Sequence, residues 1–142
     1  MAIGSARKFM TKPTKKILVV DDDADIRESV RLALEEQDYL NVEVTESADV
    51  ASGIHQMKNI NPDIVILDLH MPDKSGFDFM DIMRKNTLFA KTKVIMLTAD
   101  DTLANIFKAE NKGIGVYRFL GKPFNISDLQ ALVLSLSLPI KP

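Results

Sequence analysis

The sequence contains no cysteine among its 142 residues. This absence excludes disulfide scaffolds, zinc or iron–sulfur centres with cysteine ligands, and thiol catalysis. Only two histidines, His55 and His70, are present, so a zinc site built on imidazole also lacks its ligands. No apolar run approaches the about 18 residues that a membrane-spanning helix needs, and the N-terminus has no signal-peptide core. We therefore expect a cytoplasmic protein that does not engage a membrane.

The sequence also lacks the short motifs of several enzyme classes. It has neither the G-x-x-x-x-G-K-[ST] pattern of P-loop enzymes nor the G-x-G-x-x-G pattern of dinucleotide-binding domains. The G-x-S-x-G pattern of α/β-hydrolases is missing as well. P-loop, dinucleotide and nucleophile-elbow chemistry are therefore not indicated.

Charge is distributed unevenly along the chain. Residues 1–16 contain five basic side chains and no acidic one, whereas the other 126 residues contain 13 basic and 20 acidic side chains. An acidic body argues against direct nucleic-acid binding by the folded domain. We predict that residues 1–14 form a basic, disordered leader whose first five residues resemble a cloning remnant. Residues 15–139 are then expected to form a single domain, and residues 140–142 a tail.

Short apolar runs rich in valine and isoleucine alternate with helical patterns. Runs of this kind are typical of parallel strands that are covered on both faces, and they lie at residues 17–20, 63–67, 93–97 and 116–120. Residues 41–46 alternate apolar and polar side chains instead, which favours an edge strand.

An amphipathic helical pattern follows each predicted strand, and the fourth of these helices is expected over residues 103–113. The expected N-cap residues are Asp23, Ser47 and, for the last helix, Asn125 or Ser127, while the third helix is expected after Ser75 and Gly76. Five successive β-α units predict an α/β fold of the (βα)5 type, a doubly wound parallel five-stranded sheet with right-handed crossovers.

Polar and small side chains stand where the predicted strands end. They are Asp21, Asp22 and Asp23, then Asp68, Thr98, Ala99 and Lys122. In an open parallel sheet the carboxyl ends of all strands meet at one edge, and ligands bind there. Clustered carboxylates repel one another unless a cation lies between them. The pattern therefore predicts a divalent metal with oxygen ligands, Mg²⁺ in the first place and Mn²⁺ as a substitute, together with phosphate chemistry.

Four segments at these strand ends resemble the receiver domain of bacterial two-component response regulators. They are residues 17–23 (ILVVDDD), 68–72 (DLHMP) with Gly76, 97–99 (LTA) and 119–124 (FLGKPF). The resemblance extends over residues 15–138, which is nearly the whole chain. It implies a flavodoxin-like sheet with the strand order 2-1-3-4-5, a receiver domain over residues 15–139 and a cis peptide bond before Pro123.

The resemblance also implies a role for each site residue. Asp68 would accept a phosphoryl group from the phosphohistidine of a sensor histidine kinase or a phosphotransfer protein. The expected metal ligands are the carboxylates of Asp21, Asp22 and Asp68 and the backbone carbonyl of His70. Lys122 would pair with a phosphoryl oxygen and Thr98 would donate its hydroxyl to the phosphoryl group, while the small Ala99 leaves room beside it.

Phosphorylation would then be read at a distance. The resemblance implies that Thr98 moves toward the phosphoryl group and that Phe119 rotates inward. The surface formed by the helix at 103–113, the strand at 116–120 and the last helix would change and control a partner, an output domain or a second copy of the chain. The last helix is unusually apolar, and we expect part of it to form an exposed patch. The His70 side chain would modulate the phosphoryl lifetime, unless only its carbonyl matters.

Two alternatives stay open at this point. A Mg²⁺-dependent phosphohydrolase with Asp68 as nucleophile is disfavoured, because Asp68 follows the third strand and the residue two positions later is His70 rather than an acid. A pseudo-receiver that docks a partner without phosphorylation would lack an acidic or lysine position, and none is missing. The sequence therefore predicts a phospho-acceptor signalling domain with slow autodephosphorylation at most, and not an enzyme.

Overall fold

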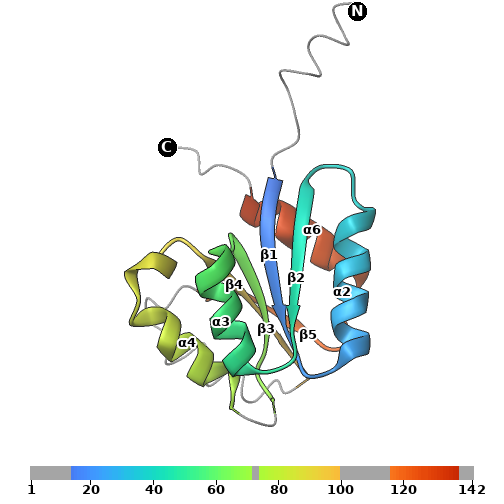
Figure 1. Cartoon of the computed structure of the whole chain (residues 1–142). Coiled ribbons are helices and arrows are strands. Elements are labelled where there is room, and N and C mark those ends of the chain that lie inside the picture. The colour runs from blue at the N-terminus through green and yellow to red at the C-terminus, as the bar shows by residue number, and fades with distance from the viewer. Residues whose placement is uncertain (1–13, 72–73, 100–115, 138–142) are drawn as a thin grey trace, which may run out of the picture.

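A computed structural model describes residues 14–71, 74–99 and 116–137 (Figure 1). Its strands are β1 (Thr14–Val20), β2 (Asn41–Ser47), β3 (Ile64–Asp68), β4 (Lys93–Thr98) and β5 (Val116–Gly121). Its helices are α2 (Ala24–Glu36), α3 (Val50–Ile60), α4 (Gly76–Arg84) and α6 (Ile126–Ser137), with the 3-10 helix η1 (Thr87–Phe89) before β4. The predicted helix over residues 103–113 lies outside the described residues.

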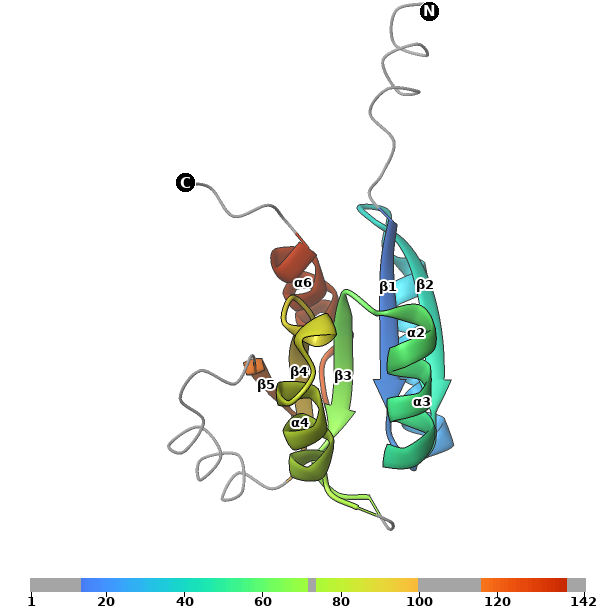
Figure 2. The same cartoon turned by 60° about the vertical axis from the view of Figure 1, so that its left-hand side comes forward.

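The strands form one parallel sheet in the order β2-β1-β3-β4-β5. Helices α3 and α4 cover one face of the sheet, and α2 and α6 cover the other (Figures 1 and 2). The chain thus starts near the middle of the sheet, winds outward to β2, and then returns past β1 to build β3, β4 and β5. This arrangement confirms the predicted doubly wound α/β fold and its strand order.

The core consists of two apolar layers that the sheet separates. Successive strand residues point to opposite faces, so Leu18 and Val20 pack under α3 and α4, whereas Ile17 and Val19 pack under α2 and α6. All of these side chains are fully buried. Each buried aliphatic side chain of this size contributes about 1.5–3 kcal/mol. A strand made of a continuous apolar run gains this energy on both faces only when helices cover both, which explains why these strands are central.

The structure confirms the predicted cap at Asp23 and one of the two candidates for the last helix, and it adds a cap at Ser75. Asp23 caps α2, and its carboxylate accepts the backbone N–H of Asp25 at 2.9 Å. Ser75 caps α4 in a reciprocal capping box with the side chain of Asp78. Of the two candidate caps for α6, Asn125 is the one whose side-chain oxygen accepts the backbone N–H of Ser127.

The prediction that Ser47 caps the second helix is wrong. Ser47 is the last residue of β2, where it pairs with Val20 of β1, so the strand continues one residue further than its pattern suggested. Asp49 caps α3 instead, accepting the amide of Ser52 at 2.7 Å. This hydrogen bond lowers the pKa of the Asp49 carboxyl.

The last helix differs from its prediction in exposure. Leu129, Val133 and Leu136 of α6 are buried, and Leu132 and Leu134 are partly buried against the same apolar layer. The exposed patch expected on this helix is therefore absent from its described part, apart from Ile126, which is 49% exposed. The helix hides so much apolar surface because it packs on α2 as well as on the sheet.

Strand β1 begins at Thr14, and the last described residue is Ser137, at the end of α6. Within the described ranges, every helix is too short or too polar to span a lipid bilayer.

Candidate functional site at the carboxyl edge of the sheet

Three charged side chains from different strands meet at the carboxyl edge of the sheet. Asp21 directly follows β1, Asp68 is the last residue of β3, and Lys122 directly follows β5. The Lys122 ammonium lies 2.7 Å from Asp21 Oδ2 and 3.3 Å from Asp68 Oδ2. These residues are as much as 101 positions apart in the chain, and parallel strand ends bring them together as the sequence predicted.

The two carboxylates are almost entirely withdrawn from water. Asp21 is 1% exposed and Asp68 is 5% exposed. The backbone N–H of Asp23 donates to Asp21 Oδ1 at 2.9 Å, and the backbone N–H of His70 donates to Asp68 Oδ1 at 3.2 Å. Each carboxylate thus receives one backbone N–H on one oxygen and the ammonium of Lys122 on the other.

The electrostatics of the site raise the pKa of Asp68 and the pKa of Lys122. Burial raises the pKa of the Asp68 carboxyl, and the negative charge of Asp21 adds to this effect, while Lys122 and the His70 amide oppose it. Burial lowers the pKa of Lys122, but its attraction to Asp21 and Asp68 outweighs burial and leaves the pKa raised. Lys122 is therefore held as a cation, and one lysine offsets only part of the negative charge.

The remaining negative charge makes this edge a candidate cation site. Oxygens of Asp21, Asp22 and Asp68 lie within 4.8 Å of one another, and Asp22 is exposed to solvent. Carboxylate oxygens beside open solvent are a donor set that suits Mg²⁺, which keeps several of its own waters. The expected trio of acidic ligands is thus assembled around one point.

Gly76 allows the chain to pass close to the end of β3. A Cβ atom on Gly76 would lie 2.6 Å from the carbonyl oxygen of Asp68, which is too short for any contact. The Gly76 amide donates to the carbonyl of Leu69 at 2.9 Å, which fixes the start of α4 against the end of β3. A side chain at this position would clash with the backbone of Asp68, which explains the glycine in the sequence motif.

The other predicted residues surround the cluster at different depths. Thr98 is buried at the end of β4, and its carbonyl accepts the amide of Lys122 at 2.9 Å. Ala99 is exposed directly after it, and the His70 side chain is also exposed. Phe119 is partly buried and packs against the apolar layer under α3 and α4. The peptide bond between Lys122 and Pro123 is cis, as expected.

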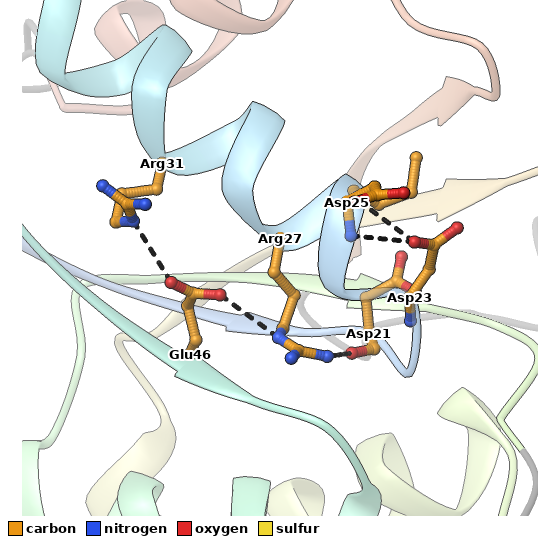
Figure 3. A network of polar contacts seen from close by, with 7 residues as sticks. Asp21, Asp23, Asp25, Arg27, Arg31 and Glu46 are labelled. Atoms are coloured by element: carbon orange, nitrogen blue, oxygen red, sulfur yellow. Dashed lines mark hydrogen bonds and ion pairs between the residues drawn. The ribbon is translucent and has the colours of Figure 1, made fainter.

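Two residues near the site escaped the sequence analysis. Arg27 of α2 donates from Nη1 to the carbonyl oxygen of Asp21 at 2.7 Å and from Nε to Glu46 of β2 at 3.2 Å (Figure 3). The only signal in the sequence is an arginine in the first turns of a helix that follows three aspartates. That pattern does not identify the acceptor of its hydrogen bonds.

A doubly wound sheet with an acidic cluster and a paired lysine at the carboxyl ends of its strands defines a domain built around a candidate cation site. The chain belongs to the response regulator receiver domain family, whose model matches residues 17–134. The resemblance drawn from the sequence is thereby confirmed, and the chain is a receiver domain of the two-component type.

Relatives from several bacteria are similar to this chain. The phosphate regulon transcriptional regulatory protein PhoB of Klebsiella pneumoniae is 30% identical over 128 residues, which are 90% of this chain and 54% of that protein. The chain thus spans about half the length of this relative. Protein PilG of Pseudomonas aeruginosa is 28% identical, and the match covers 80% of this chain and 81% of that protein.

Solved structures support the same conclusion. The chemotaxis protein CheY4 of Vibrio cholerae superposes with a TM-score of 0.75 at 30% identity, and the match covers 87% of this chain and 98% of that one. Family and fold therefore agree on a signalling domain.

Proposed function

We propose that residues 15–139 form a receiver module that accepts a phosphoryl group on Asp68 in a reaction that depends on Mg²⁺ or Mn²⁺. The observation that carries the proposal is the buried Asp68 carboxylate, which lies at a strand end beside Asp21, Asp22 and the ammonium of Lys122. The donor is the phosphohistidine of a sensor histidine kinase or a phosphotransfer protein, and the proposed setting is the cytoplasm.

The chemistry is a transfer between two nucleophiles. An oxygen of the Asp68 carboxylate forms a bond to phosphorus, the bond from phosphorus to the histidine nitrogen breaks, and the departing imidazole keeps the electron pair and takes up a proton. Such transfers need positioning and charge neutralisation more than covalent help. Asp68 Oδ1 is held by the His70 amide, and Lys122 stands beside Oδ2, ready to pair with a phosphoryl oxygen.

The metal would be held by Asp22 and Asp21 with Asp68 and the backbone carbonyl of His70. Its contribution is a double positive charge that offsets the phosphoryl oxygens during transfer. Burial and Asp21 raise the pKa of Asp68 and so disfavour its ionised, nucleophilic form. Cationic groups at the edge restore that form, which explains why Lys122 pairs with both carboxylates.

The output of the module is a change in shape. Thr98 would donate its hydroxyl to the new phosphoryl oxygens, in the space that Ala99 leaves, and Phe119 would rotate inward as Thr98 moves. This rearrangement would alter the surface formed by residues 103–113, β5 and α6, and with it the contact to a partner, an output domain or a second copy. Autodephosphorylation would be slow and modulated by the exposed His70.

The direct test is phosphorylation by acetyl phosphate with Mg²⁺, followed by intact-mass spectrometry. The wild type should gain one phosphoryl group, and Asp68→Asn should gain none. The matched control is Asp63→Asn, which changes the same residue type just before β3 at the opposite edge of the sheet. Equal phosphorylation of the wild type and Asp68→Asn would remove Asp68 from its proposed role.

A further inference from the structure

The guanidinium of Arg27 joins the candidate cation site to the edge strand of the sheet. Its Nη1 donates to the carbonyl oxygen of Asp21 at 2.7 Å, and its Nε donates to Glu46 Oε1 at 3.2 Å (Figure 3). Hydrogen bonds from a charged donor are short and strong, and the Arg27 side chain is only 17% exposed. A planar guanidinium that binds two acceptors at once fixes them relative to each other.

The position of Glu46 is itself determined from two sides. Arg27 binds Oε1, and Arg31, one turn further along α2, binds Oε2 at 3.2 Å. Arg31 also pairs with Glu35 at 3.5 Å, which is a contact within α2. Glu46 therefore lies between two arginines, but only Arg27 passes the restraint on to Asp21.

Both peptide groups of Asp21 are tied to consecutive residues of β2. The Asp21 amide donates to the carbonyl of Ser47 at 3.1 Å, while the Asp21 carbonyl is held through Arg27 by Glu46. The carbonyl of Asp21 and the amide of Asp22 belong to one rigid plane. A restraint on that carbonyl therefore also sets the direction in which the chain leads into Asp22.

We infer that Arg27, oriented by Glu46, is a positioning residue that presents Asp21 and Asp22 to the cation. The inference rests on the proposed function, because it assumes that these carboxylates bind a divalent metal. Groups that orient metal ligands from outside are worth a substantial part of the affinity of such sites. Arg27 thus acts through the peptide backbone and does not touch the metal.

The direction in which metal affinity changes when Arg27 is removed distinguishes a positioning role from an effect of its charge. A positive charge near a cation site repels the cation, so removal of Arg27 as a mere charge would tighten binding. Removal of Arg27 as a positioning residue would weaken binding, because the peptide between Asp21 and Asp22 loses its restraint. Arg31 offers the matched control, since it carries the same charge and shares Glu46, and its ion pairs in the described part of the chain are with Glu46 and Glu35.

The test compares Arg27→Gln with Arg31→Gln in Mn²⁺ titrations of the whole chain. The electron paramagnetic resonance signal of free Mn²⁺ gives the dissociation constant, and competition gives that of Mg²⁺. Arg27→Gln should bind about tenfold more weakly, at the lower limit for the loss of an orienting partner, and Arg31→Gln should bind as well as wild type or slightly better. Urea unfolding in EDTA shows that each titrated variant is folded.

A second variant keeps the charge unchanged. Glu46→Asp retains the carboxylate but withdraws it from Arg27 by one methylene, and it should weaken Mn²⁺ binding about threefold if oriented partners govern affinity. This variant changes a partly exposed edge position, so it decides the question even if Arg27→Gln does not fold.

The outcomes distinguish the two proposals. Wild-type protein that binds neither Mn²⁺ nor Mg²⁺ would overturn the proposed function and this inference with it. Wild-type binding with equal or tighter binding by Arg27→Gln would overturn the inference alone. Equal weakening in Arg27→Gln and Arg31→Gln would also overturn it, because it would show a general effect of the contact between α2 and β2. Unchanged binding by Glu46→Asp would have the same consequence.

Discussion

Similar polar residues lie at the carboxyl edge of the sheet, where its strands end, and at the amino edge, where they begin, but their interactions differ. At the carboxyl edge, Lys122 pairs with both Asp21 and Asp68, so one basic side chain faces two acidic ones. At the amino edge, polar side chains instead satisfy the backbone. Asp63 illustrates the difference, since its carboxylate accepts the amide of Lys16 at 2.8 Å and its own amide donates to the carbonyl of Lys16.

Two further residues follow the same rule at the amino edge. Thr92 is buried and donates its hydroxyl to the carbonyl of Pro62 at 2.8 Å. Lys93 reaches the carbonyl of Leu136 at 2.7 Å, in the last turn of α6. A cation at the C-terminal end of a helix binds carbonyls that have no partner within the helix.

The comparison separates stability from function within one sheet. A polar group that completes backbone hydrogen bonds lowers the free energy of the folded chain. Buried carboxylates that face each other raise that energy until a cation offsets their charge. In the absence of a ligand, the carboxyl edge therefore destabilises the folded chain, as expected of residues that serve binding rather than stability.

The largest expected effect concerns the two lysines at opposite edges. Lys122→Gln should slow phosphorylation by acetyl phosphate about a hundredfold, the typical loss when a group that stabilises transferred charge is removed. Lys93→Gln should leave that rate unchanged and lower the free energy of unfolding by about 1 kcal/mol, because the contact of Lys93 with the end of α6 is lost. Mass spectrometry over time and urea unfolding measure the two quantities. A comparable loss of phosphorylation rate in both variants would contradict the proposed difference between the carboxyl edge and the amino edge.

The same substitution at two aspartates should change stability in opposite directions. In EDTA at pH 7, Asp68→Asn should raise the free energy of unfolding by about 1 kcal/mol, since it removes a buried charge beside Asp21 while Lys122 keeps its closer partner. Asp63→Asn should lower it by about 1 kcal/mol, because a backbone hydrogen bond is weakened. Urea unfolding of both variants measures these changes.

The gain in Asp68→Asn should depend on pH. The folded-state pKa of Asp68 is raised, so the folded protein takes up a proton more readily than the unfolded chain as the pH falls. The wild type therefore recovers stability as the pH drops through this raised pKa, and the difference between wild type and Asp68→Asn should shrink as the pH falls toward the ordinary pKa of an aspartate, 3.8. A difference that grows with falling pH would contradict the raised pKa.

The smallest expected effect lies at the rim of the site. His70→Asn should change the rate of dephosphorylation several-fold and leave Mn²⁺ binding intact, because the backbone carbonyl and amide of residue 70 remain. The exposed side chain of His70 can shield the phosphoryl group or orient a water. Phosphoryl decay, followed for wild type and variant in the same buffer, measures the effect. Superimposable decay curves for wild type and variant would leave only the carbonyl of His70 with a role.

The strands and the charged cluster could be predicted from sequence for a simple reason. Continuous apolar runs identify central parallel strands, and the ends of such strands must meet. The convergence of Asp21, Asp68 and Lys122 follows from these two rules without knowledge of any long-range contact. The receiver family added the roles of the residues, which no spacing rule provides.

The missed features depend on neighbours that are distant in sequence. Glu46 lies 19 residues after Arg27, and only the pairing of β1 with β2 brings the two together. Serine often caps helices, so the sequence favours a cap at Ser47, whereas the register with β1 extends the strand through this residue. The burial of α6 also depends on a distant neighbour, because α2 covers part of it, as the hydrogen bond from Gln130 to the carbonyl of Ala33 shows.

The position of β3 in the sheet has a consequence for hydrogen exchange. All five residues of β3 are buried, and the strand is paired with β1 on one side and β4 on the other. Strand β5, which carries Phe119, is paired with β4 alone among the described strands, and its register shifts between Val94 and Ile95. Amides of β3 should therefore exchange only through global unfolding, and those of β5 through smaller openings. The proposed phospho-acceptor would then stay fixed on the slowest-exchanging strand, while the outer strand adapts to it.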